Sequence, residues 1–303
     1  MAARFAPSPT SDLHIGNLRT ALLAWLYARA ANLAFYVRIE DLDQCRILAA
    51  PSIAQQQLHD LATLGLDWDG PVLKQSERFE LYRGAAATLP TYECFCTRRE
   101  VAEATQAPHG SYRPYPGTCA NLSLAERKQR RLTRMAAIRV HAAGARFSVH
   151  DRFAGVVTRK VDDFVLIRND GLPAYNLAAV VDDGLQRVTQ VTRGADLIDS
   201  APRQAWLATK LGFDVSEYIH VGMAVNSAGQ RLAKRDGAVT LRELTASGHS
   251  VQDVYWMLTD SLSWPRTANP TELLAVILGE PTLLNSATLA APWVVKPNCS
   301  PLS

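Results

Sequence analysis

The most constraining feature of the chain is its N-terminal segment, where a strand, a proline-rich turn, a helix and a second strand follow one another. Arg4–Ala6 is a short strand that Pro7 and Pro9 must end, because proline cannot donate to a strand ladder. Helical spacing runs from about Leu18 to Ala31, and an apolar strand follows at Leu33–Ile39. Two strands joined by a helix predict a parallel, Rossmann-like sheet, in which ligands bind beyond the carboxyl ends of the strands.

The start of this helix carries the sequence His14-Ile-Gly-Asn17. A helix N-terminus offers free backbone N–H groups and a positive dipole end, both of which attract phosphates. We expect Asp12 to cap the helix, His14 to point toward a bound phosphate, and Gly16 to let a nucleotide base approach the backbone. Asn17 can donate a hydrogen bond but carries no charge. The tetrapeptide alone is equally compatible with an ordinary helix start that holds an incidental histidine.

A basic segment lies much later in the chain, at Gln230–Gly237. Gly229 and Gly237 bracket it, so we expect a loop that can move. Lys234 within it is a compact point charge, which suits a pyrophosphate leaving group. Such a run by itself is usually a solvated basic loop. Together with the helix N-terminus, however, it provides what a nucleoside triphosphate requires.

Residues that can together bind an amino acid lie at the predicted carboxyl ends of neighbouring strands, namely at Arg4, Ala6, Ser8, Glu40, Tyr175 and Arg193. Glu40 suits an ammonium group, arginine suits a carboxylate, and Tyr175 and Ser8 are neutral partners. An arginine that faces the substrate side chain would favour glutamate over glutamine, because an unpaired buried guanidinium is costly. Each residue taken singly also fits a structural ion pair. We interpret the neighbouring carboxylates as residues that orient loops, namely Asp41, Asp43, Asp182 and Asp183.

The remaining chain is expected to continue the sheet around an insertion. Helical stretches at about Ser52–Leu64 and Ser76–Leu89 precede a turn-rich, cysteine-bearing region. β-like alternation follows at residues 146–168, and a charged helix face at Glu126–Arg134 is either solvated or a contact for nucleic-acid phosphates. The α/β pattern then resumes with strands at Tyr175–Val181, Arg187–Thr192 and Tyr218–Val221 and a helix at residues 200–211.

Cysteine spacing predicts a metal site. Cys94 and Cys96 lie two positions apart, and Cys119 follows Tyr115 by four positions. Such spacing is typical of tetrahedral zinc sites, and buried free thiols are the alternative. A phenolate oxygen is an unusual zinc ligand, so the residues alone favour His109 as the fourth ligand.

Composition narrows the class of protein. With 303 residues and 48% hydrophobic content, the chain can form two or three structural units. No apolar run approaches the roughly 20 residues of a membrane span, and the N-terminus lacks a signal-peptide core. The net charge of +3 is too small to argue for nucleic acid by itself. The five cysteines lack a disulfide framework, which predicts a reducing, cytoplasmic setting, with Cys45 and Cys299 as bystanders.

These segments resemble the signatures of class I aminoacyl-tRNA synthetases. Arg4–Thr20 resembles the HIGH motif in the wording of the glutamyl branch, and Gln230–Gly237 resembles KMSKS with Ala233 in place of its serine. Further words that match the glutamyl branch are R-I-E-D at 38–41, P-A-Y-N-L-A at 173–178 and V-T-R-G-A-D-L at 191–197. The resemblance covers roughly residues 3–240.

The resemblance implies which residues bind which substrate. His14 and Lys234 are the implied catalytic residues, which stabilise charge on the phosphates of ATP with Mg²⁺ assisting. The implied ATP-binding residues are Thr10, His14, Gly16, Asn17, Arg231, Leu232, Ala233, Lys234 and Arg235. The implied L-glutamate-binding residues are Arg4, Phe5, Ala6, Pro7, Ser8, Glu40, Tyr175 and Arg193. Short members of the branch carry C-x-C…Y-x-x-x-C as a structural zinc site, which implies Cys94, Cys96, Tyr115 and Cys119 as ligands of one Zn²⁺.

The length of the chain and its cysteine motif are similar to those of the short glutamyl-queuosine tRNA(Asp) synthetase family. The residues after Gly237 leave room for a helical stem-contact-like unit but not for a large anticodon-binding domain. The family activates glutamate with ATP and esterifies it to queuosine at the wobble position of tRNA(Asp). The implied partner is therefore the anticodon stem-loop of that tRNA, and we expect a monomer without a membrane partner. The sequence identifies no general base for the transfer step.

The expected fold class is α/β, with a Rossmann-like parallel sheet split by a zinc-bearing α/β insertion and followed by a small helical C-terminal unit. The expected domains are 1–90 and 173–239 as the two halves of the catalytic domain, 91–172 as the insertion, and 240–303 as the helical region and tail. Two alternatives remain open. The chain could be a truncated glutamyl-tRNA synthetase that charges the tRNA 3′ end, or a non-catalytic paralogue that binds tRNA or adenylate, an alternative to which Ala233 gives slight support.

Overall fold

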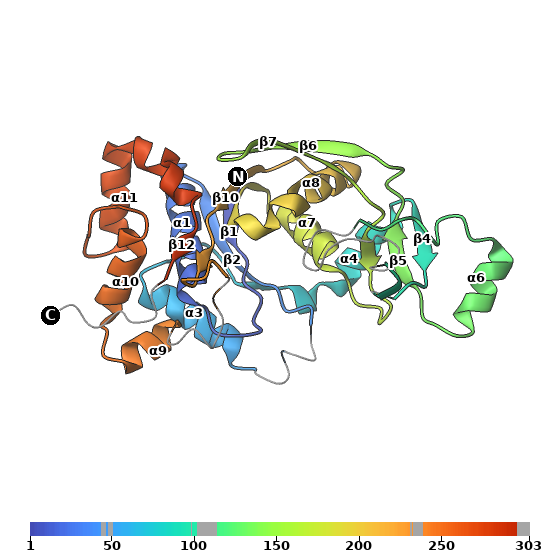
Figure 1. Ribbon diagram of the computed structural model, residues 1–303, viewed down its shortest axis with the longest axis horizontal. Helices are drawn as coiled ribbons and strands as arrows, with labels where there is room; N and C mark the ends of the chain where they lie inside the picture. The colour runs from blue at the N-terminus through green and yellow to red at the C-terminus, as the bar shows by residue number, and fades with distance from the viewer. Residues whose placement is uncertain are drawn as a thin grey trace.

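A largely parallel sheet forms the centre of the protein (Figure 1). A computed structural model describes residues 1–43, 47, 51–97, 99–101, 114–230, 232 and 239–295. Seven strands pair in the order β3-β2-β1-β9-β10-β6-β7, and every pair is parallel except β6–β7. Their bounds in that order are Leu73–Lys74, Ala34–Ile39, Ala2–Phe5, Val188–Gly194, Glu217–Val221, Arg146–Asp151 and Gly155–Lys160. The predicted α/β class is thereby confirmed.

Helix α1 (Ile15–Ala30) is the core element on one face of the sheet. Twelve of its sixteen residues are buried, because it lies between β1 and β2 on one side and α10 (Val251–Asp260) and α11 (Pro270–Gly279) on the other (Figure 1). A helix that is apolar almost all round is what such a double-sided position requires. The predicted helix and its flanking strands are thus present.

Helices α7 (Tyr175–Leu185) and α8 (Ala201–Lys210) complete the core away from α1. In β10, Ile219 joins the α1 core, whereas Tyr218 packs with residues of α8 on the opposite face, as strand alternation requires. Helix α4 (Phe79–Ala87) packs against α7 in a second cluster of buried residues. Helix α3 (Ile53–Thr63) and the 3₁₀ turns Gln75–Glu77 and Ala195–Ser200 connect these parts.

The prediction of a strand at Tyr175–Val181 is wrong, because this run begins helix α7. Residues 177–182 of the helix are all buried, so the sequence shows a continuous apolar run instead of a helical stripe. A short buried run of this kind cannot be assigned to strand or helix by periodicity alone. Tyr175 therefore enters the fold at a helix N-terminus and not at the end of a strand.

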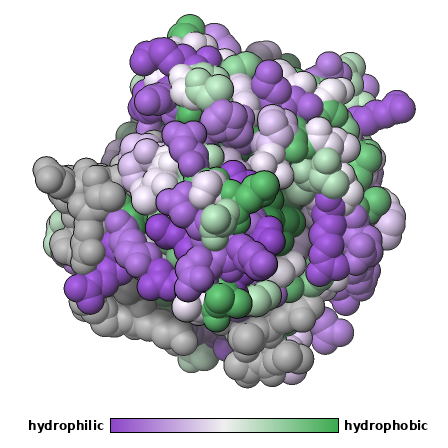
Figure 2. All heavy atoms as spheres, turned by 90° about the vertical axis from the view of Figure 1, so that its right-hand side faces the viewer, coloured by the Kyte–Doolittle hydropathy of each residue, from purple (hydrophilic) through white to green (hydrophobic). Residues whose placement is uncertain are grey.

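A three-stranded antiparallel sheet forms the far end of the protein, with β4 (Thr91–Cys94), β5 (Ala137–Val140) and β8 (Val165–Ile167). Helix α6 (Leu124–Arg131) begins at a Ser123 capping box, has no buried residue, and projects beyond this sheet (Figure 1). Figure 2 looks onto this end of the molecule, where hydrophilic residues cover much of the visible surface. The predicted charged helix is therefore present, with no buried residue.

The hairpin β6–β7 falls within the range 91–172 that the sequence predicts as an insertion, yet it extends the main sheet through β10. The segment between the two halves of the sheet thus contributes both a separate small sheet and the edge of the main one. The four domain boundaries themselves stay a prediction.

The C-terminal part is helical, as predicted, and then returns to the sheet region. Helix α9 (Leu241–Ala246) precedes α10 and α11, and 3₁₀ turns follow at Pro281–Asn285 and Ala287–Leu289. Strand β12 (Trp293–Val294), within the predicted tail, pairs in parallel with β11 (Ala224–Val225). Among the helices of the described residues, none is long and apolar enough to cross a membrane.

We predict that Gly222→Ala destabilises the protein, because a β-carbon there would lie 1.8 Å from the carbonyl oxygen of Ala291. The backbone of Gly222 cannot shift freely, since its N–H donates to Leu289 at 2.8 Å and its oxygen accepts from Arg19 at 2.9 Å. Overpacking of this kind costs about 1–3 kcal/mol, which urea unfolding measures. The control is Gly84→Ala, in the exposed face of α4 with no atom within 4 Å of the added carbon. Equal stability of the two variants would contradict the prediction.

Candidate active site

A cavity of about 380 Å³ opens where β1, β2 and β9 end and α1 begins. It collects residues that are far apart in the sequence. Many of the residues predicted to bind ATP or glutamate line this cavity. They are Arg4, Phe5, Ala6, Pro7, Ser8, Thr10, His14, Gly16, Asn17, Glu40, Tyr175 and Arg193. Leu232 does not line it but packs against the α1 core. Arg231, Ala233, Lys234 and Arg235 lie outside the described residues.

His14 is itself the N-cap of α1, so the prediction of Asp12 as the cap is wrong. The ring Nδ1 accepts from the backbone N–H groups of Gly16 (3.1 Å) and Asn17 (3.3 Å). The Oδ1 of Asn17 in turn accepts from the N–H of His14 at 3.3 Å. The Asp12 carboxylate accepts from Arg242 instead. Local capping by the imidazole outcompetes the aspartate because the histidine stands directly before the first helical residue.

The capping bonds determine what His14 can offer to a ligand. In the neutral ring, an Nδ1 that accepts leaves the proton on Nε2. Two backbone N–H groups that were expected to face phosphate are instead satisfied by the ring. Gly16 is needed for internal packing as well, since an added β-carbon would lie 2.5 Å from that of Ala224. At the helix start, the His14 imidazole therefore lines the cavity and occupies those two backbone N–H groups.

The residues that follow the predicted basic loop, Val239 and Thr240, lie against the first turn of α1, beside the cavity. Ile15 donates its N–H to the oxygen of Val239 at 2.6 Å, and His14 forms an isolated antiparallel bridge with Thr240. Thr240 caps α9 in a capping box with Glu243. The residues that follow the loop are thus attached to the first turn of α1.

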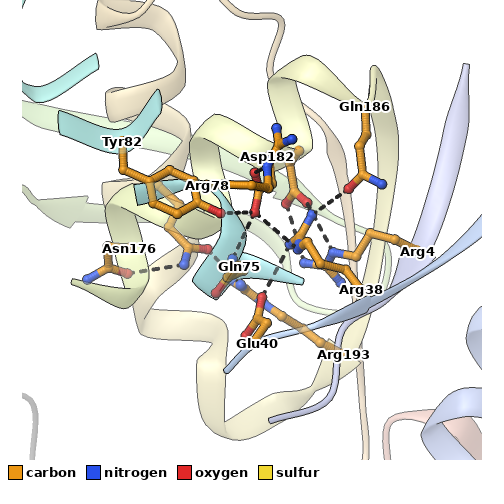
Figure 3. Close-up of polar contacts among 12 residues, drawn as sticks. Arg4, Arg38, Glu40, Gln75, Arg78, Tyr82, Asn176, Asp182, Gln186 and Arg193 are labelled. Carbon is orange, nitrogen blue, oxygen red and sulfur yellow. Dashed lines mark hydrogen bonds and ion pairs between the residues drawn. The ribbon is translucent and has the colours of Figure 1, made fainter. Parts of the chain in front are cut away.

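Asp183 on α7 binds two buried arginines from the N-terminal strands. These are Arg4 and Arg38, which Figure 3 shows near Glu40 and Asp182. The Oδ1 of Asp183 accepts from Arg38 at 2.7 Å and from Arg4 at 3.2 Å, and Arg38 also donates to Glu40 at 3.2 Å. Burial opposes ionisation of Asp183, but the two guanidinium groups outweigh it and lower its pKa. The adjacent Asp182 accepts from Gln75, Arg78 and Tyr82.

The neighbouring carboxylates therefore differ in what they hold. Asp183 pairs with Arg4 and Arg38 of two strands and does not orient a loop as predicted. Asp182 accepts from Gln75 and Arg78, in and next to the turn Gln75–Glu77, and so holds a connecting segment. Asp41 does hold a turn, because it accepts from the backbone N–H of Ser76 at 2.7 Å and from its hydroxyl at 2.6 Å.

Arg193 is held in a different way from the other two arginines. Its Nε–H donates to Nε2 of His220 at 3.0 Å, and its terminal nitrogens donate to Gln204 at 2.6 Å and to the oxygen of Leu197 at 3.2 Å. All three acceptors are neutral. Of the five N–H donors of an arginine, this leaves two for the cavity that Arg193 lines.

Glu40 supplies a negative group to the cavity, which Asp12 and Asp196 also line. The Glu40 side chain is 10% exposed. Burial raises the pKa of Glu40, although Arg38 and Arg4 act in the opposite direction. A cationic ligand group at this carboxylate would favour its ionised form. The cavity thus combines carboxylates with the guanidinium groups of Arg4 and Arg193, which suits an amino acid that bears an additional carboxylate.

Sequence reasoning missed several residues of the cavity. Thr192 lies directly before Arg193, and its buried hydroxyl has no hydrogen-bond partner within the described residues. Gln57 on α3 donates to the backbone oxygens of Ser8 (3.1 Å) and Ser11 (2.7 Å) and so holds the proline-rich turn. Met223 and Ala224 follow β10 at its carboxyl end, which is a signal that could have identified them.

The three motif cysteines form a second site, at the far end of the protein. Their Sγ atoms all lie within 4.8 Å of one another, and Cys96 and Cys119 are 3.6 Å apart. The Oη of Tyr115 lies 3.4 Å from Cys94 and 3.6 Å from Cys96. For bonds of about 2.0–2.3 Å, a tetrahedral site requires ligand separations of roughly 3.3–3.8 Å. The four side chains thus fit a metal site, and His109 lies outside the described residues.

Comparison with known proteins places these features in a family. A model of the class I tRNA synthetase catalytic domain (E and Q) matches residues 1–258. Glutamyl-Q tRNA(Asp) synthetases from Cutibacterium acnes and Nocardia farcinica are each 54% identical, over 93% and 90% of this chain and 82% and 88% of their own. The one from Deinococcus radiodurans is 45% identical over 91% of this chain and 94% of its own.

A solved structure shows the same fold. The crystal structure of a glutamate tRNA ligase from Elizabethkingia meningosepticum, in complex with its amino acid, superposes with a TM-score of 0.76 at 25% identity. The match covers 96% of this chain but only 66% of that longer ligase.

We predict that Asp183→Asn lowers the free energy of unfolding by roughly 3 kcal/mol or more, because it leaves the buried charges of Arg4 and Arg38 without their shared carboxylate. The pKa of Asp183 is lowered in the folded state, so its contribution is complete above the unfolded value of about 3.9 and is lost as pH falls through the folded value. Denaturant unfolding at neutral and acidic pH should therefore show a difference that shrinks in acid.

The control is Asp199→Asn, which removes the surface partner of Arg159 at 2.8 Å. Both side chains of that pair are nearly half exposed, so its loss should cost less than about 1 kcal/mol. A variant at Asp183 no less stable than this control would overturn the structural role of the carboxylate.

Proposed function

This chain belongs to the glutamyl-Q tRNA(Asp) synthetases, within the class I tRNA synthetases for E and Q, and we propose that it activates L-glutamate with ATP and transfers it to queuosine in tRNA(Asp). The observation that carries the proposal is the convergence of Glu40, Arg193 and His14 on one cavity. This cavity offers partners for an ammonium group, a carboxylate and a phosphate within one volume. The partners of the protein are then glutamate, ATP and the anticodon stem-loop that carries queuosine.

Glutamate binding follows from the charges of the cavity. Glu40 receives the ammonium group, whose charge favours the ionised carboxylate. Arg193 receives the side-chain carboxylate, because its own charge is not paired with an acid within the described residues. Ser8 and Tyr175 line the same cavity and supply neutral partners.

Activation is an in-line displacement at phosphorus. An oxygen of the glutamate α-carboxylate attacks the α-phosphate of ATP, the bond to the β-phosphate breaks, and pyrophosphate leaves with Mg²⁺ neutralising part of its charge. The imidazole Nε2–H of His14 donates to the phosphates, and Lys234 on the basic loop stabilises the leaving group. A hydroxyl of queuosine then attacks the carbonyl of the mixed anhydride, and AMP leaves as the ester forms.

The test of the function has two stages. Glutamate-dependent ATP–pyrophosphate exchange without tRNA distinguishes an activating enzyme from a non-catalytic paralogue. Labelled glutamate is then mapped by nuclease digestion, and its attachment is tested for sensitivity to periodate. Label in the anticodon nucleotide is the expected result, whereas label at the 3′-terminal adenosine would favour a truncated glutamyl-tRNA synthetase.

We predict that Lys234→Ala slows pyrophosphate exchange by a factor that corresponds to about 3 kcal/mol, the typical contribution of one preorganised group to a charged transition state. The control is Lys160→Ala, which removes an exposed lysine of β7 and should leave exchange unchanged. Equal exchange rates in both variants would reject the assignment of the basic loop.

We further propose that Cys94, Cys96, Tyr115 and Cys119 bind one structural Zn²⁺. When bound, the ion would hold β4 to the segment that carries Tyr115 and Cys119. The support is that three separations among the four ligand atoms are 3.4–3.6 Å and that the three Sγ atoms lie within 4.8 Å of one another. The thiols are free and not joined in a disulfide. Thiols kept in this form also fit a reducing, cytoplasmic compartment.

We predict that Cys96→Ser loses the metal and lowers the stability of the three-stranded sheet, because metal binding contributes directly to folding. Zinc content per chain and thermal unfolding are the measurements. Cys45→Ser, outside the motif, is the control and should keep full zinc content. Undiminished zinc in the Cys96 variant would refute the site.

A further inference from the structure

Arg193 is a buried cation without an acidic partner. It is 6% exposed, yet no carboxylate pairs with it in the described part of the chain, whereas Arg4 and Arg38 both pair with Asp183. Burying an uncompensated guanidinium is unfavourable unless an anion completes the site. The arrangement therefore keeps the positive charge of Arg193 available for a ligand carboxylate.

The bond from Arg193 defines the protonation state of His220. An arginine Nε–H can only donate, so Nε2 of His220 must accept and the ring proton must lie on Nδ1. That Nδ1–H donates to Oδ2 of Asp151 at 2.7 Å. Burial lowers the pKa of His220, Asp151 opposes this effect and Arg193 reinforces it, and the ring stays neutral. The ring also stacks on Tyr218, with centroids 5.8 Å apart.

Asp151 is an acceptor on both of its oxygens. Oδ2 accepts from the backbone N–H of His220 at 3.0 Å as well as from its ring, and Oδ1 accepts from the N–H groups of Phe153 (3.1 Å) and Ala154 (2.8 Å). The residue is fully buried and lies on β6, where that strand pairs with β10. Four donors thus fix its position and, through it, the orientation of the imidazole.

We propose that His220 and Asp151 are positioning residues that set selectivity for glutamate over glutamine. The neutral imidazole of His220 accepts from the Arg193 guanidinium and holds it in place. The same ring lies between Arg193 and Asp151, so the carboxylate does not contact the guanidinium directly. A carboxylate in direct contact would compensate the charge of the arginine, as Asp183, Glu40 and Asp182 together do for Arg4 and Arg38. This inference rests on the proposed function, because it assigns Arg193 to the side-chain carboxylate of the substrate.

The test compares His220→Gln with His220→Leu in glutamate-dependent pyrophosphate exchange. Both variants lose the hydrogen bond from the ring Nδ1–H to Asp151. Only the glutamine variant keeps a neutral acceptor, its amide oxygen, near the position of Nε2, where it can accept from Arg193. The leucine variant should raise the KM for glutamate by about 10- to 100-fold, the equivalent of one hydrogen bond to a charged group, with KM for ATP unchanged. It should also weaken discrimination against glutamine, and the glutamine variant should restore both properties to within a few-fold of wild type.

If His220 had only a structural role, the two variants would behave alike. Any loss of activity would then appear equally in kcat, in the KM for glutamate and in the KM for ATP. That outcome would overturn the inference but leave the proposed function intact. Absence of exchange in the wild-type protein would instead reject the proposed function. The two failures are therefore distinguishable.

Asp151→Asn gives an independent readout. An amide offers one oxygen in place of two, so an N–H group must face either His220 or the Phe153–Ala154 turn. Ring ¹⁵N chemical shifts should show the Nδ1–H tautomer of His220 in the wild type and a different tautomer mixture in the variant, together with a raised KM for glutamate. A wild-type ring that is charged or protonated on Nε2 would overturn the inference without reference to activity.

Discussion

The carboxylate of Asp183 is the interaction on which the rest of the structure depends. It lies on α7, and it binds Arg4 and Arg38, which are separated from it by 179 and 145 positions. The two arginines are 4% and 0% exposed, so neither can exchange this partner for water. Because β1 and β2 precede the intervening segment and α7 follows it, Asp183 links the two halves of the split sheet in addition to the direct pairing of β1 with β9. One of its two partners, Arg4, lines the cavity.

The same pairing determines how charge is distributed around the cavity. Asp183 compensates Arg4 and Arg38, and Arg38 then orients Glu40, whereas Arg193 is left with neutral acceptors only. An amino acid with a second carboxylate completes this pattern, because its ammonium and carboxylate groups would satisfy Glu40 and Arg193 together. The free energy for selectivity is therefore already present in the protein as the unfavourable burial of the Arg193 charge, which has only neutral acceptors.

The sequence predicted the parts of the site that depend on local pattern. The strand–turn–helix–strand order of residues 4–39 is present because proline and helical spacing act locally. His14 was predicted to face phosphate, but its capping role was not, since the competition with Asp12 is decided by which side chain stands next to the first helical N–H. His220 and Asp151 carry no sequence signal, because their pairing arises only when the hairpin β6–β7 joins β10.

Helix α8 connects the two sites of the molecule. Gln204 on this helix accepts from Arg193, and the adjacent Arg203 donates to Oδ1 of Asp162 at 2.5 Å. The Oδ2 of Asp162 accepts from the backbone N–H of Tyr115 at 2.9 Å, within the cysteine cluster. Neighbouring residues of α8 thus contact Arg193 directly and the backbone of Tyr115 through Asp162. The cavity and the cysteine cluster are therefore linked by hydrogen bonds that share one helix, which fixes both to the same rigid element.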